Sequence, residues 1–286
     1  WSQETTLSND LIINSGVTLT IGAKVTISGD VTISGGGTIK RGNDYKDELL
    51  SVPLGAELTL QNITIDGGAI WNGDTTSGLT AEESAIRIEG GEVTLDSGAV
   101  VQNNNHISVR DNPYIHSGTR YYNMGGGIAV YGGTLTMNNG AQIKNNAVTN
   151  TDYEKKNEGN SDSHGGGVAV YENGTFIMNG GEISGNRAVV SNSEGRAFGG
   201  GVSLLTRGAN RESPSTLDNY KIAFTMNGGT ISGNRVNDAG AGVYGCVDQG
   251  DEAAARKNHL EMHIAGKIAK NASTKSGGGV QVGSAD

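Results

Sequence analysis

The fold of this chain is decided by residues 165–187, which read GGGVAVYENGTFIMNGGEISGNR. Three short stretches of alternating, β-branched residues are separated here by glycine and asparagine, a pattern typical of strands joined by tight turns. Related copies begin at residues 125 (GGGIAVY), 199 (GGGVSL), 240 (GAGVY) and 277 (GGGVQV), with a weaker copy at 85 (AIRI). Aligned on residues 85, 127, 167, 201, 242 and 279, the copies are 42, 40, 34, 41 and 37 residues apart. An elastic repeat of this length predicts a solenoid.

An asparagine lies three residues after the central Ile or Val of the third stretch. The set is Asn104, Asn146, Asn186, Asn234 and Asn271. Asparagine tolerates the left-handed backbone that a sharp corner needs, and amides stacked one above another can form a hydrogen-bonded ladder. We therefore predict an all-β fold, a parallel β-helix with three short strands per coil, an asparagine ladder and an interior of Ile, Val, Leu and Met.

Composition excludes several other classes of protein. Glycine contributes 47 of the 286 residues and proline only 3, which argues against an ordinary helical enzyme, and the glycines do not recur every third residue as in collagen. A net charge of −9 disfavours a nucleic-acid partner. One cysteine cannot form an internal disulfide, and no apolar run approaches the roughly 18 residues of a membrane-spanning helix. We expect no nucleic acid and no membrane span in this segment.

The motif G-G-G-V-x-V followed by M-N-G-G-x-I-S-G-N resembles the right-handed parallel β-helix repeat proteins of bacterial cell surfaces. Residues 85–286 carry the resemblance, and residues 1–84 match more loosely, as irregular opening coils of the same single domain. The resemblance implies the right-handed fold and an extracellular or cell-surface setting. It implies no single activity, because adhesins, lyases, hydrolases and inert stalks share this architecture. We also expect a monomer, truncated at its C-terminus one strand into a fresh coil.

Insertions in the repeats flank one strand, the one after the glycines. They occupy residues 106–124, 147–164, 188–198 and 236–239 before the glycine triplets, and residues 206–221 and 247–258 after the strand. Stacked coils would place these loops as two walls along one face. Strand alternation would then turn Tyr131, Tyr171 and Tyr244 outward onto the floor of a groove.

Such a groove is the predicted binding site, and it suits a carbohydrate such as a host-surface glycan. Tyrosine rings stack on apolar sugar faces while sugar hydroxyls reach polar side chains, here Asp162, His164 and Arg196 in the walls. The simpler interpretation is that the tyrosines are strand residues favoured by β-propensity and that the wall residues are solvated loop residues.

Enzymatic activity has weaker support. Glycoside hydrolysis needs two carboxylates about 5 to 9.5 Å apart, and Asp238 with Asp248, or Asp248 with Asp251, are candidate pairs without a complete motif. Arg87 and Glu89 face outward together, but no neighbouring strand supplies the further acids of a calcium-dependent lyase. Scattered histidines and acids show no metal-ligand spacing, so we expect no metal and no cofactor.

Three hypotheses follow from the sequence. The first is an extracellular β-helix module for adhesion or glycan binding. The second is a carbohydrate-active enzyme, a glycoside hydrolase or polysaccharide lyase, with its site in the loop-walled groove. The third is a passive stalk, which leaves the one-sided insertions without a purpose.

Overall fold

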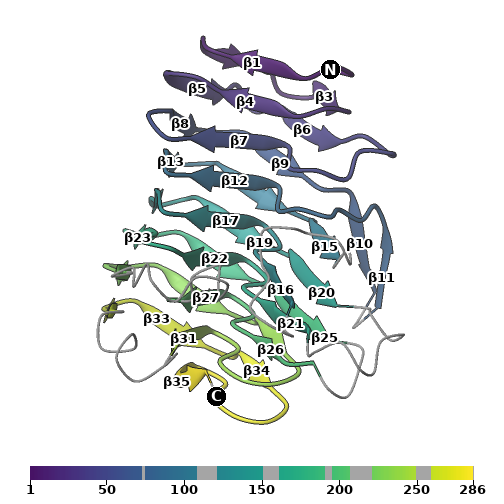
Figure 1. The fold of residues 1–286 in the computed structure, drawn as a ribbon. Helices are drawn as coiled ribbons and strands as arrows, with labels where there is room; N and C mark the ends of the chain where they lie inside the picture. Colours follow the sequence, from purple (N-terminus) through teal and green to yellow (C-terminus); the bar gives the residue numbers. More distant parts are fainter. Residues whose placement is uncertain are drawn as a thin grey trace, which may run out of the picture.

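The computed structural model describes residues 1–72, 75–107, 121–150, 161–190, 195–206, 221–248 and 259–285. Within these ranges the chain forms strands and turns and no helix, and strands of successive coils pair in parallel. Figure 1 shows the coils stacked along one axis, with the two termini at opposite ends. The predicted all-β parallel solenoid is confirmed.

Three long sheets wrap the coils. Sheet A contains β1 (Thr5–Leu7), β4 (Val25–Ile27), β7 (Leu50–Pro53), β12 (Ile86–Glu89), β17 (Ile128–Tyr131), β22 (Val168–Tyr171), β27 (Val202–Leu205), β31 (Val243–Asp248) and β35 (Val280–Ala285). Sheet B contains β2 (Leu11–Ile12), β5 (Asp30–Ser34), β8 (Glu57–Leu60), β13 (Glu92–Leu95), β18 (Thr134–Met137), β23 (Thr175–Met178), β28 (Lys221–Met226) and β32 (His259–Ile264). Sheet C contains β3 (Thr18–Ile21), β6 (Thr38–Arg41), β9 (Thr64–Asp66), β14 (Val100–Gln102), β19 (Gln142–Lys144), β24 (Glu182–Ser184), β29 (Thr230–Ser232) and β33 (Lys267–Ala269). Residues 1–84 and the later repeats share these three sheets.

Two further sheets lie in the segments that the sequence analysis treated as insertions. Sheet D contains β15 (Asn105–Ile107), β20 (Ala147–Asn150), β25 (Arg187–Val190), β30 (Arg235–Val236) and β34 (Ala272–Ser273). Sheet E contains β16 (Tyr121–Met124), β21 (Ser161–His164) and β26 (Ala197–Phe198). A coil of the middle repeats therefore carries five strands, two more than predicted.

The interior is built from columns of like residues. The register places Ile128 on Val168 and Val168 on Val202, and all three side chains are fully buried. In sheet B the rings of Phe176 and Phe224 stack with centroids 5.1 Å apart. Burying one such side chain stabilises the fold by about 1.5–3 kcal/mol, and each coil needs its neighbours to complete that burial.

A buried row of asparagines turns the corner between sheets C and D. Asn146 Nδ2 donates to Asn186 Oδ1 at 3.1 Å, and Asn186 Nδ2 donates to Asn234 Oδ1 at 3.0 Å. Asn186 Nδ2 also donates to the Ile143 carbonyl oxygen at 2.9 Å. The same pattern connects Asn104 to Asn146 and Asn234 to Asn271. These bonds satisfy the polar groups of an otherwise apolar corner, which would be costly to bury unpaired.

A β-hairpin leaves the third coil and lies along later ones. Its strands β10 (Ala69–Asn72) and β11 (Thr75–Gly78) pair antiparallel and run lengthwise along the solenoid in Figure 1. Trp71 Nε1 donates to the Asn145 carbonyl oxygen at 2.8 Å, and the Arg187 guanidinium lies 4.8 Å from the Trp71 ring centroid. The hairpin thus ties coils that are distant in sequence. Across the described ranges there is also no helix of the length and apolarity needed to cross a membrane.

We predict that Asn186→Ala lowers the free energy of unfolding by about 3 kcal/mol, because it leaves buried donors of Asn146 and a buried acceptor of Asn234 unpaired. Asn179→Ala, in an exposed row of similar amides, is the matched control and should cost less than about 1 kcal/mol. Urea unfolding followed by circular dichroism measures both. Equal losses for the two variants would contradict the role of burial.

Candidate functional site

Sheet E covers part of the outward face of sheet A. Met124 and Phe198 of sheet E belong to one buried apolar cluster with Ala129, Ala169 and Tyr171 of sheet A. His164 Nδ1 lies 3.3 Å from the Ser203 hydroxyl oxygen. On its other face sheet E packs against sheet D, through a second cluster that contains Val148, Ala188, Val190 and Ala197. The side that the sequence suggested as an open groove is therefore a second interior.

The glycine triplets make this layering possible. Gly165 has φ +70°, and a β-carbon there would lie 2.7 Å from the Ala169 β-carbon on the strand below. A β-carbon on Gly166 would collide with the Arg187 backbone in sheet D, and one on Gly167 would lie 3.1 Å from the Asn186 side chain. Each glycine of the triplet thus permits a close approach to a different neighbour, and only the first also requires a left-handed backbone.

The tyrosines predicted to form the groove floor are mostly covered. Tyr171 is 1% exposed and Tyr244 is 5% exposed, so the expectation that these two rings line an open groove is wrong. They point outward from sheet A as alternation requires, but outward here means toward sheet E. Tyr131 is half-buried, with its ring centroid 4.7 Å from that of Tyr171. Burial raises the pKa of all three phenols.

The structure brings four of the predicted binding residues together. Arg196 donates through its backbone N to Asp162 Oδ1 at 3.1 Å and through Nη2 to Asp162 Oδ2 at 3.4 Å. The His164 ring centroid lies 6.2 Å from that of Tyr244, and Phe198 stacks on Tyr244 at 4.4 Å. Strand alternation explains the grouping, because Asp162 and His164, and likewise Arg196 and Phe198, are two residues apart and face sheet A.

Arg196 forms the accessible edge of this group. Its side chain is 31% exposed, whereas that of Asp162 is 2% exposed. The guanidinium lies 5.4 Å from the Phe198 ring centroid, and its Nε has no hydrogen-bond partner within the described ranges. Arg196 is thus held in place by a buried carboxylate and a ring while retaining donor capacity.

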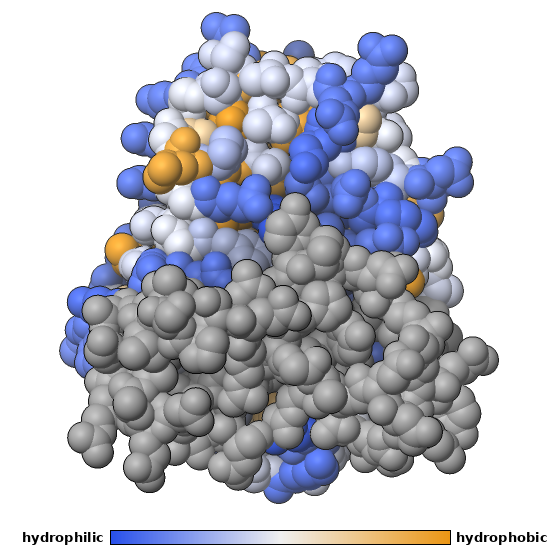
Figure 2. Space-filling view, in the orientation of Figure 1, coloured by the Kyte–Doolittle hydropathy of each residue, from blue (hydrophilic) through white to orange (hydrophobic). Residues whose placement is uncertain are grey.

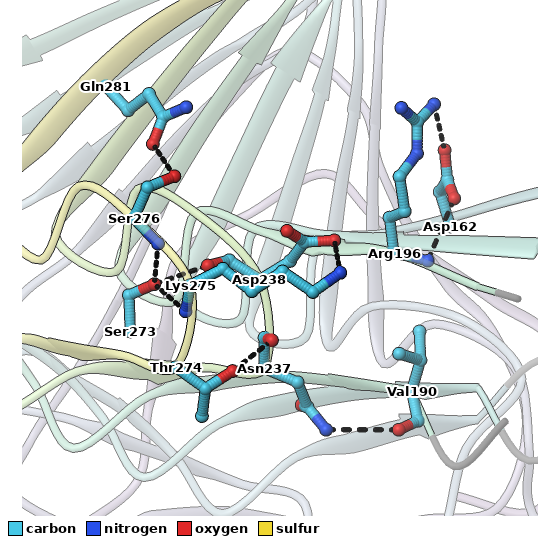
Figure 3. Close-up of polar contacts among 10 residues, drawn as sticks. All are labelled: Asp162, Val190, Arg196, Asn237, Asp238, Ser273, Thr274, Lys275, Ser276 and Gln281. Carbon is cyan, nitrogen blue, oxygen red and sulfur yellow. Dashed lines mark hydrogen bonds and ion pairs between the residues drawn. The ribbon is translucent and has the colours of Figure 1, made fainter. Parts of the chain in front are cut away.

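The predicted catalytic acids do not form a visible pair. Asp238 Oδ2 accepts from Lys275 Nζ at 3.1 Å, and its backbone carbonyl accepts from the Ser273 hydroxyl. Figure 3 shows Asp238 inside this loop contact, apart from the Asp162–Arg196 pair. Asp251 and the side chain of Asp248 lie outside the described residues. The proposed pairs with Asp248 and Asp251 therefore stay predictions.

One charged cluster was recognised only in part from the sequence. Arg87 and Glu89 do face outward from β12, and Arg87 Nε donates to Glu89 Oε1 at 2.9 Å. A further acid, Glu83, comes from the segment just before the strand, and Arg87 Nη1 donates to it at 3.1 Å. The guanidinium also lies 4.5 Å from the Tyr131 ring centroid. The four-residue offset between Glu83 and Arg87 was the available signal, but it is an ordinary spacing for two loop-flanking residues.

Burial controls the charge of these groups. It raises the pKa of Glu83 to about 6, opposed by the Arg87 charge. It lowers the pKa of His164 to about 3, with help from the Arg196 charge, and that of His106 to about 4. In the ranges that the structure describes, no group of three or more His, Cys, Asp or Glu side chains could hold a metal ion. The arrangement offers an anchored guanidinium and neutral imidazoles under cover.

Charge also differs over the surface. Figure 2 shows hydrophilic residues gathered on the side of the upper coils where β6 and β10 lie in Figure 1, with weakly polar residues over the rest of those coils. No protein-family model, no curated protein and no solved structure matches the chain. Functional inference therefore depends on the chemistry of the residues described above.

We predict that His164 makes the fold sensitive to acid. Its pKa is depressed in the folded state, so its stabilisation is present above about pH 6.5 and is lost as the pH falls toward 3. Between pH 6 and pH 4 the wild type should lose about 2 kcal/mol more than His164→Phe, which stays neutral. His263→Gln, at a side chain that is 67% exposed, is the control and should keep the wild-type slope. Urea titrations at several pH values test this, and parallel slopes for His164→Phe and the wild type would contradict it.

Proposed function

We propose that this chain is a module of a bacterial cell-surface protein that binds glycans on the loop-bearing side of sheet A. The observation that carries the proposal is the state of Arg196. Its guanidinium is fixed by Asp162 and Phe198, is partly exposed, and has an Nε without a partner among the described residues. A planar guanidinium held in this way suits hydroxyl or carboxylate oxygens of a sugar.

The architecture supports the same function. Sheets A to C form a scaffold in which each coil supports the next, and sheets D and E occur on one side only. The segments 108–120, 151–160 and 191–194 connect sheet D to sheet E, and 207–220 and 249–258 leave sheet A. Elaboration of one side of a rigid scaffold is typical of a protein that presents a binding surface.

The extracellular setting is part of the proposal. It is supported by the resemblance of the repeats to surface proteins and by the acidic composition. The enzyme alternative is less well supported, because the one predicted catalytic acid whose side chain is described, Asp238, is ion-paired with Lys275.

We predict that Arg196→Ala lowers affinity for retained glycans at least about tenfold, with a smaller loss for Arg196→Lys, which keeps charge without the planar fork. A glycan-array screen followed by calorimetry on the best ligand measures the effect. Lys221→Ala, an exposed cation on sheet B, is the control and should bind as the wild type does.

Mass spectrometry of the recovered sugars separates the three hypotheses. Intact glycans support binding, whereas cleaved products would overturn the proposal in favour of an enzyme. Failure to retain any glycan would overturn it in favour of a stalk.

A further inference from the structure

A second row of amides lies on the outside of the solenoid, at the corner between sheets B and C. Asn138 Nδ2 donates to Asp96 Oδ1 at 3.2 Å, Asn179 Nδ2 donates to Asn138 Oδ1 at 3.0 Å, and Asn227 Nδ2 donates to Asn179 Oδ1 at 2.9 Å. Unlike the row at Asn186, this one is solvent-accessible, and Asn179 and Asn227 are exposed. Each amide therefore keeps hydrogen-bonding capacity for a ligand.

The residues two and four positions before these asparagines complete a flat array. Strand pairing sets Thr136, Ile177 and Thr225 in one column, and Thr134, Thr175 and Ala223 in another. All six side chains are partly exposed on sheet B. The outer array of sheet B thus has three columns, which present hydroxyl and methyl groups, then a methyl-rich strip, then amides.

Two physical properties of this array point to its partner. It repeats every strand, at about 4.8 Å along the solenoid axis. It also contains no ionisable side chain, so a charged ligand would find no counter-charge within it. Hydrogen bonds along the amide row fix the side chains before any ligand arrives, which reduces the entropy that binding must overcome.

From these properties we infer that the outer array of sheet B binds an extended, uncharged polysaccharide of β-1,4-linked sugars, lying along the solenoid axis. Such a chain advances by a length similar to the strand spacing for each sugar residue. Successive sugars would then meet equivalent groups, with hydroxyls on the amides of Asn138, Asn179 and Asn227 and apolar faces on the methyl groups of Thr136, Ile177 and Thr225. This surface is on a different sheet from Arg196.

The test is calorimetric titration with cellohexaose and with chitohexaose. At least one of these hexasaccharides should bind the wild type, and Asn179→Asp and Asn227→Asp should each weaken that binding at least about tenfold, because a carboxylate replaces a donor and adds charge. Ile177→Glu changes the array without touching the amide row and should give the same loss. Circular dichroism establishes that each variant is folded.

Asn9→Asp makes the same chemical change at an exposed asparagine of the first coils and should leave binding unchanged. Arg196→Ala should also leave hexasaccharide binding unchanged, so the two proposed sites fail or succeed separately. The inference is overturned if neither hexasaccharide binds the wild type, or if folded Asn179→Asp, Asn227→Asp and Ile177→Glu all bind as tightly as the wild type.

Discussion

The structure depends on in-register stacking of equivalent residues from one coil to the next. Because the strands pair in parallel without a shift, a side chain such as Asn186 lies directly between its own equivalents, Asn146 and Asn234. An amide is well suited to this position, since it has donors for one neighbour and an acceptor for the other. The same constraint makes apolar columns apolar throughout and puts like groups side by side on the outer surface.

Stacking also explains why glycine is so abundant. Where sheet E turns into sheet A, the backbone passes over Ala169 on one side and against Arg187 on the other, with no room for β-carbons at Gly165 or Gly166. In the later copy Gly240-Ala241-Gly242 the second position is an alanine, which is fully buried beside Val236. The triplets are thus the hinge that folds a second layer onto the solenoid, and they give the protein an interior on both sides of sheet A.

Sequence reasoning predicted the part of the fold that repeats closely. The alternation in residues 165–187 identified sheets A, B and C and the inward residues, because strand period and turn residues are local signals. It missed sheets D and E, whose strands lie in segments of unequal length and are stabilised by contacts such as His164 with Ser203, 39 residues apart. For the same reason it grouped Asp162, His164, Arg196 and Tyr244 correctly but predicted an open groove, since alternation gives the direction of a side chain and not what covers it.

The central claim is that the outward face of sheet A is closed by sheet E, and Cys246 reports on it directly. This only cysteine of the chain belongs to the buried cluster between the two sheets and is 1% exposed. Its reaction with a thiol reagent such as dithionitrobenzoate should be measured in native protein and in denaturant. A closed interlayer predicts a native thiol that does not react on the timescale of complete reaction in denaturant. Equal rates in the two conditions would show an open face and contradict the two-layer arrangement.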